Sequence, residues 1–196
     1  MLNILLIFSL LVVPRSTWDW DGYIQYGHYR TVEGTFTIPR LPPIQDCGTI
    51  YRVAEFVGFG DTPVAQAGMS ASSCRSTDSR VGYYAWVEDW PQSEVPLFSV
   101  RAVPGQTFHV SIRLRHGWMD YTMELPHHTY GGSLILPYTP TPTREWVVEM
   151  ASSWYNYGRV RVSGVYCPCQ PLIEDQGGGY QASPSPLHGQ SYWTRW

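Results

Sequence analysis

Residues 108–114 read Phe-His-Val-Ser-Ile-Arg-Leu, a strict alternation of apolar and polar side chains. Because successive side chains of a β-strand point to opposite faces, this pattern predicts a strand with one buried and one solvated face. Other segments alternate or are β-branched in a similar way, and Gly or Pro bounds them. They are residues 35–38, 51–57 and 159–162.

The chain as a whole favours short strands over helices. Its 196 residues include 18 Gly and 16 Pro, which leave little room for long helices. Strand after short strand predicts an all-β fold, an antiparallel β-sandwich or jelly roll, and the length suits one domain over residues 18–196. Residues 167–190, rich in Gly, Ser and Pro, read as a long loop, and residues 191–196 as a last strand.

The N-terminal residues 1–17 are interpreted as a signal peptide. Their apolar run is too short to span a bilayer as an ordinary helix, so we expect a secreted protein without a membrane segment after signal removal. A retained anchor is the alternative. In an exported protein four cysteines predict disulfides, with three possible connectivities. These are Cys47, Cys74, Cys167 and Cys169.

Charge and composition narrow the set of partners. Charged residues make up only 15%, all 13 basic residues are Arg, and the formal net charge is -3 with no basic run. We therefore expect no nucleic-acid partner. We also expect a monomer. The Cys167-Pro168-Cys169 segment could bind a metal, but no second pair stands at zinc-ribbon spacing. The sequence thus predicts neither a metal site nor a cofactor.

Period-2 geometry decides which polar side chains share a face of the sheet. In residues 145–149, Trp146 and Val148 point one way if they enter the core, so both glutamates project from the other face. Residues 64–68 and 84–88 likewise set an amide and a carboxylate opposite small or apolar side chains. A curved sheet could therefore gather four side chains on one face: Gln66, Trp86, Glu88 and Glu149.

The order of these segments resembles the glutamic peptidase family, also called eqolisins or peptidase family G1. The family pattern is a Trp-Val-Gly-Ile strand, then Leu-Gln-Thr/Ala-Gly, then Tyr-x-Ala-Trp-Tyr-Glu-Trp-Tyr-Pro, then a Gly-Asp turn, then Ala-Glu-Trp-Ile-Val-Glu. The corresponding segments here are residues 56–59, 65–68, 83–91, 105–106 and 144–149. The resemblance extends over nearly everything after the apolar N-terminus.

The resemblance implies a concanavalin A-like sandwich of two curved antiparallel sheets. It also implies an acid endopeptidase that cleaves proteins or peptides with a Gln/Glu dyad. By position in the motifs, Gln66 would be the catalytic Gln and Glu149, the second glutamate of its motif, the catalytic Glu. The first glutamate, Glu145, would have no part in the chemistry. Four further side chains would contact the substrate: Trp86, Glu88, Tyr84 and Trp20.

Amide hydrolysis explains why such a pair is suitable. One group must take a proton from water and return it to the leaving nitrogen, and another must stabilise the oxyanion. A glutamate with an ordinary pKa of about 4.3 can do the first near pH 4, and a glutamine amide donates N–H bonds at any pH. The pair is therefore suited to proteolysis in acid.

Two other classes of function remain alternatives to the peptidase. A jelly-roll glycoside hydrolase could use Glu88 and Glu149 as its carboxylate pair. A non-catalytic carbohydrate- or protein-binding sandwich could use Trp86, Trp118 and Trp154 for contacts.

Tyr84 stands where family members often carry Asp, and Phe56 replaces the usual Trp. A divergent, inactive member of the glutamic peptidase family is therefore a further alternative.

Overall fold

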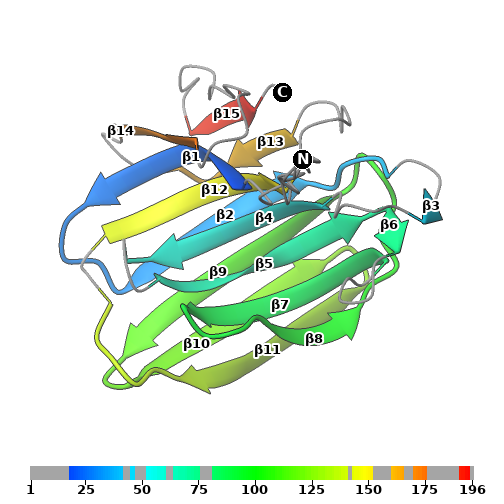
Figure 1. Ribbon diagram of the computed structural model, residues 1–196. Coiled ribbons are helices and arrows are strands. Elements are labelled where there is room, and N and C mark those ends of the chain that lie inside the picture. Colours follow the sequence, from blue (N-terminus) through cyan, green and yellow to red (C-terminus); the bar gives the residue numbers. More distant parts are fainter. Residues whose placement is uncertain are drawn as a thin grey trace, which may run out of the picture.

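The chain folds into two stacked antiparallel β-sheets with a small two-stranded extension, as a computed structural model shows (Figure 1). The structure describes residues 18–41, 45–46, 52–60, 64–75, 81–140, 143–151, 160–165, 170–175 and 190–194. Within these ranges every regular element is a strand, and no helix that could cross a membrane is found. The prediction of an all-β sandwich is confirmed.

The first sheet has seven strands and carries most of the motifs described above. In spatial order they are β14 (Gln170–Asp175), β1 (Trp18–Tyr26), β12 (Thr143–Ala151), β4 (Arg52–Phe59), β5 (Val64–Ser72), β7 (Gly82–Trp90) and β8 (Val95–Ser99). All its pairings are antiparallel, so hydrogen bonds bring segments far apart in the sequence side by side.

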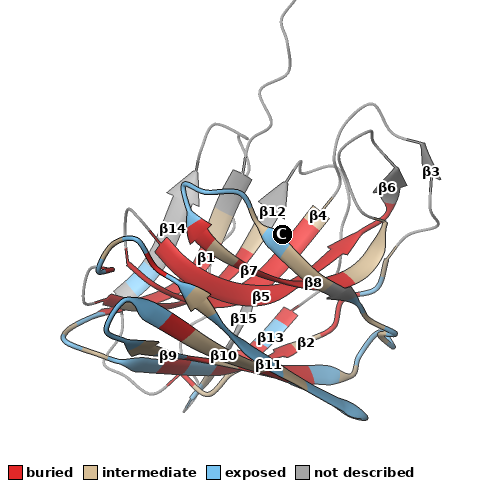
Figure 2. Cartoon of the chain, turned by 90° about the horizontal axis from the view of Figure 1, so that it is seen from below, coloured by how far each residue is buried: buried red, intermediate tan, exposed pale blue. Residues whose placement is uncertain are grey.

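The second sheet has six strands and packs against the inner face of the first (Figure 2). Its spatial order is β11 (His128–Ile135), β10 (Trp118–Leu125), β9 (Thr107–Arg115), β2 (Thr31–Thr37), β13 (Val160–Ser163) and β15 (Ser191–Thr194). Strand β9 has the predicted alternation, because Phe108, Val110 and Ile112 are buried between partly or fully exposed neighbours. Two short strands, β3 (Gln45–Asp46) and β6 (Cys74–Arg75), pair separately.

Two predictions about the chain ends have different outcomes. The last strand is confirmed as β15. The long loop over residues 167–190 is wrong for residues 170–175, which form β14 and pair with β1. The sequence rule failed because Gly and Pro occur next to edge strands as well as in loops. The predicted signal peptide and the cysteine side chains lie outside the described residues, so secretion and disulfides stay predictions.

The inner face of the first sheet buries two carboxyl groups along with the apolar core. Asp21 and Glu55 both lie opposite Val148, one on each neighbouring strand, and are 0% and 1% exposed. Neither carboxyl has a hydrogen-bond partner within the described part of the chain. Burial raises the pKa of Asp21 to about 8 and the pKa of Glu55 well above its ordinary value. Both acids are therefore neutral in the native state at acidic pH.

These acids predict a fold that loses stability as the pH rises. Below the ordinary pKa of 3.8 Asp21 is protonated in both states, whereas between 3.8 and about 8 only the unfolded chain releases the proton. The free energy of unfolding should then fall by roughly 1.4 kcal/mol per pH unit for each such acid. Urea unfolding between pH 4 and 7 should show a shallower decline for Asp21→Asn and for Glu55→Gln.

The control for this prediction is Glu124→Gln, because Glu124 is exposed on β10. That substitution should leave the pH dependence of unfolding as in the wild type. An unchanged pH slope in both buried variants would contradict the assignment of neutral acids to the core.

Candidate active site

The outer face of the first sheet carries the predicted site residues. Its inner face holds Ala65, Ala67, Ala85, Val87, Trp146 and Val148 in the main core. The alternate side chains, including Gln66, Glu88 and both glutamates of residues 145–149, therefore point to the outer face. The period-2 prediction of which side chains share a face is confirmed.

One row of cross-strand neighbours contains most of the polar groups, and we call it the Gln66 row. Glu145 of β12 pairs with Gly58 of β4, Gly58 pairs with Gln66 of β5, and Gln66 pairs with Glu88 of β7. Paired residues of a sheet project to the same face, and strands lie about 4.8 Å apart. Glu145 and Gln66 therefore flank Gly58 at about 10 Å between backbones.

Gly58 leaves the space through which Glu145 approaches Gln66. A Cβ built at position 58 would overlap with the Glu145 Oε1 atom and also crowd its Cγ and Cδ. The carboxylate of Glu145 thus lies over the glycine that separates it from Gln66. Two side chains that could not meet across a larger residue can converge here.

Gln66 is held in place by Glu88. The Gln66 Nε2 group donates a hydrogen bond to Glu88 Oε2, while Gln66 Oε1 is buried and finds no hydrogen-bond partner among the described residues. Burial raises the pKa of Glu88, and the hydrogen bond from Gln66 opposes that rise. Gln66 and Glu145 are 3% and 1% exposed, so their electrostatic interactions are little screened by water.

Glu149, the glutamate predicted to act with Gln66, lies on the same face of the sheet as Gln66 but in a different cross-strand row. Glu149 pairs with Ala54 and with Trp20, four residues along β12 from Glu145, or about 13 Å. Its Oε1 accepts a hydrogen bond of 2.7 Å from Trp20 Nε1. Burial raises the pKa of Glu149 to about 7, a rise that the Trp20 hydrogen bond and Arg52 oppose. The carboxyl group of Glu149, the second glutamate of the motif, is therefore hydrogen-bonded to Trp20 and lies outside the Gln66 row.

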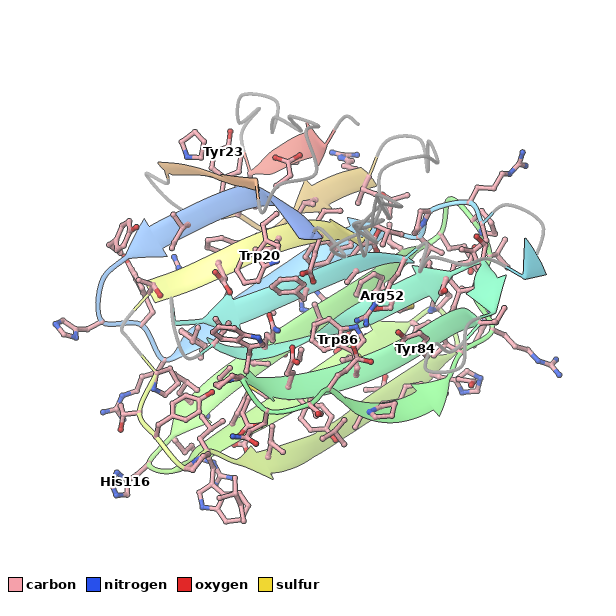
Figure 3. All side chains as sticks on the ribbon, viewed as in Figure 1. Trp20, Tyr23, Arg52, Tyr84, Trp86 and His116 are labelled. Atoms are coloured by element: carbon pink, nitrogen blue, oxygen red, sulfur yellow. The ribbon has the colours of Figure 1, made fainter. Side chains whose placement is uncertain are left out.

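An aromatic cluster lies next to these polar groups on the same face (Figure 3). Phe56 lies at its centre, with Trp20 on one side and Trp86 on the other, each with ring centroids 5.6 Å away. Ala54, Tyr84 and Val147 complete it. Of the four side chains predicted to contact substrate, Trp20, Tyr84 and Trp86 thus lie in this cluster, and Glu88 lies in the Gln66 row.

Arg52 covers one end of the aromatic cluster. Its guanidinium carbon lies 5.5 Å from the Tyr84 ring centroid and 5.7 Å from that of Trp86, and the group forms an ion pair with Glu94. Arg52 Nε and Trp86 Nε1 both donate to Ser70 Oγ at 2.8 Å. Sequence reasoning missed Arg52, Ser70 and Glu94, because no motif that we recognised contains them.

The polar groups of this face are next considered as metal ligands. Among the described residues no group of three or more His, Cys, Asp or Glu side chains could hold a metal ion. The Gln66 row offers a neutral amide and two carboxyl groups, and the carboxyl of Glu145 lies over the glycine between it and Gln66. Such a set can position a water, take a proton from it and donate an N–H bond.

Comparisons with known proteins give the family and the fold. The sequence matches the Peptidase A4 family over residues 19–167. A search of the curated proteins found no match. A crystal structure of scytalido-glutamic peptidase with a transition state analogue inhibitor is similar in fold, with a TM-score of 0.64 and 15% identity over 93% of this chain and 98% of that chain. SCP-B, a member of the eqolisin family solved with the tripeptide Ala-Ile-His, has a TM-score of 0.61 and 16% identity over the same shares.

The Ser70 contacts generate a stability prediction. Ser70 is fully buried, so Ser70→Ala would leave the Arg52 and Trp86 donors without their acceptor. We expect a loss of about 1–3 kcal/mol in the free energy of unfolding, measured by urea denaturation. Ser99→Ala, at an exposed serine of β8, should change it by less than about 0.5 kcal/mol. Equal stability of the two variants would show that the Ser70 hydroxyl contributes nothing.

Proposed function

The chain belongs to the Peptidase A4 family and is a glutamic endopeptidase, and we propose that Gln66 and Glu145 carry its chemistry. The observation that supports this pair is the register that sets both residues beside Gly58 on one face of the sheet. A family match over residues 19–167 also favours the peptidase interpretation over the glycoside hydrolase and the binding sandwich.

In the proposed reaction the Glu145 carboxylate takes a proton from water as that water attacks the substrate carbonyl. The proton then passes from Glu145 to the leaving amide nitrogen, so one carboxyl serves first as base and then as acid. Gln66 acts on both the attacking water and the carbonyl oxygen. Its Oε1, which lacks a protein partner within the described residues, can accept a hydrogen bond from the water.

The Gln66 Nε2 group supplies the oxyanion donor. An amide nitrogen has two protons, and one of them is donated to Glu88. The other is available for the oxygen that becomes negative in the tetrahedral intermediate. Glu88 therefore acts as a positioning residue, because its hydrogen bond restricts rotation of the Gln66 amide. Such a preoriented donor in a nearly buried site is worth about 3–4 kcal/mol of transition-state stabilisation.

Glu149 has a separate role in this proposal. With a pKa of about 7, Glu149 is mostly neutral near pH 4 and becomes negative as the pH rises through 7. It then adds negative charge to the face on which the oxyanion forms. We propose that Glu149, together with Trp20, Tyr84 and Trp86, contacts the peptide substrate. Secretion of the enzyme remains a proposal of the same kind.

Substitution of the two glutamates should separate their roles. We expect Gln66→Ala and Glu145→Gln each to lower kcat for casein-derived peptides at pH 4 by about a hundredfold or more, because an oxyanion donor or the base is lost. Glu149→Gln should keep kcat within about tenfold of the wild type and should change KM more than kcat. Circular dichroism and urea unfolding would establish that each variant is folded.

The reverse result, a large loss of kcat in Glu149→Gln with an active Glu145→Gln, would restore the assignment made from the motif alone. Cleavage of β-glucans in place of peptides by the wild type would instead support the glycoside hydrolase alternative.

A glycine substitution tests the geometry without removing a titratable group. Gly58→Ala would force the flexible end of the Glu145 side chain to move, at little cost to the fold. We expect kcat to fall by about tenfold to a hundredfold because the base is displaced from the water. In the matched control, Gly132→Ala, the added methyl group displaces only the end of the Tyr121 side chain on the second sheet. Undiminished activity of Gly58→Ala would argue against Glu145 as the base.

A further inference from the structure

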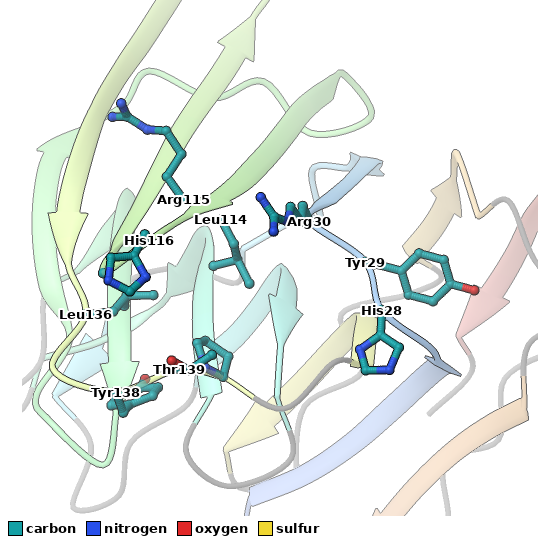
Figure 4. A pocket seen from close by; sticks show the side chains of 11 residues that line it. His28, Tyr29, Arg30, Leu114, Arg115, His116, Leu136, Tyr138 and Thr139 are labelled. Carbon is teal, nitrogen blue, oxygen red and sulfur yellow. The ribbon is translucent and has the colours of Figure 1, made fainter.

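A pocket of about 310 Å³ opens at one end of the sandwich, and we call it the end pocket (Figure 4). Three connections supply its walls: residues 28–30 between β1 and β2, residues 114–117 around the β9–β10 turn, and residues 136–140 after β11. Leu114, Leu136 and Pro140 provide apolar surface. The pocket is thus assembled from segments that are distant in the sequence.

The charged side chains that line the end pocket are all basic. They are His28, Arg30, Arg115 and His116, and no Asp or Glu is among the lining residues. Arg115 is already engaged by Asp120, with Nε 2.5 Å from Oδ2. Within the described chain, no carboxylate forms an ion pair with His28, Arg30 or His116. These three side chains therefore present positive charge that is available to an anion in acid.

Tyr138 connects the end pocket to the Gln66 row. It lines the pocket, and its hydroxyl donates a hydrogen bond of 3.1 Å to the carbonyl of Val64, two residues before Gln66. Burial raises the pKa of Tyr138, and the negative charges of Asp89 and Glu88 raise it further. The pocket therefore lies at the same end of the sheet as the proposed dyad. A peptide long enough to pass Tyr138 could occupy both places.

We propose that the end pocket binds a carboxylate of the peptide substrate, either its C-terminal carboxylate or an acidic side chain remote from the cleaved bond. This inference rests on the proposed function. Arg30 offers the planar fork of donors that suits a carboxylate, and the two histidines add charge on either side. A terminal carboxyl ionises above about pH 3.5, and a guanidinium keeps its proton in proteins, so the attraction operates above that pH.

The test compares three peptides that share one cleavage site: a free C-terminal acid, the C-terminal amide, and the amide with a glutamate near its C-terminus. At pH 4.5 the wild type should have a kcat/KM about threefold to fivefold higher for one or both carboxylate peptides than for the plain amide, mainly through KM. The preferred peptide identifies the source of the carboxylate. Arg30→Gln and His116→Gln should each bring the ratio closer to one.

The matched control is Arg101→Gln, because Arg101 is an exposed arginine in the connection between β8 and β9. It removes the same charge from the molecule and should leave the ratio unchanged. Equal kcat/KM for all three peptides in the wild type would overturn the inference. So would a preference that both pocket variants retain in full.

A binding measurement separates this inference from the proposed dyad. Fluorescence anisotropy of the three labelled peptides on Gln66→Ala should show the same preference without turnover, and inorganic phosphate should compete with it. If this preference in binding is found but the wild type cleaves none of the three peptides, the result would support the pocket and count against the dyad. Phosphate binding without any preference among the peptides would mean an adventitious ion only, and would overturn the proposal.

Discussion

The antiparallel register of β12, β4, β5 and β7 is the constraint on which the site depends. Each pairing brings one residue of the Gln66 row opposite the next, so Glu145, Gly58, Gln66 and Glu88 line up across four strands without any long-range loop. A ladder of backbone hydrogen bonds holds this alignment more firmly than flexible side chains could. Because Gly58 has no side chain, the proposed base and the amide can converge above the sheet.

Burial of carboxyl groups on both faces of this sheet connects stability to function. Asp21 and Glu55 lie in the core without partners within the described residues, and Glu149 lies on the outer face with a pKa of about 7. Desolvation favours the neutral form of each of these acids, so the fold and the site both tolerate acid and both acquire unfavourable charge as the pH rises. Acid therefore leaves these buried carboxyl groups in the uncharged form that burial favours.

Around the proposed dyad the protein combines family motifs with contacts of its own. Tyr84 stands where family members often carry Asp, and here its ring lies under Arg52, which also pairs with Glu94. Ser70 joins Arg52 to Trp86 through one hydroxyl. Such contacts arise from residues spread over three strands, β4, β5 and β7, and the segment leading into β8, so no single stretch of sequence could reveal them.

The sequence alone determined the all-β class, the family and the outer face for Gln66, Glu88 and Glu149, since alternation and motif order are local properties of the chain. It could not choose between Glu145 and Glu149, because residues two or four apart on a strand share a face and a shift of register by two preserves every buried position. Tertiary pairing places Glu145 opposite Gly58 and Glu149 opposite Ala54, and the proposed choice of Glu145 rests on that register. Tertiary structure alone also decided β14 and the end pocket, because hydrogen bonding and packing bring separate segments together to form them.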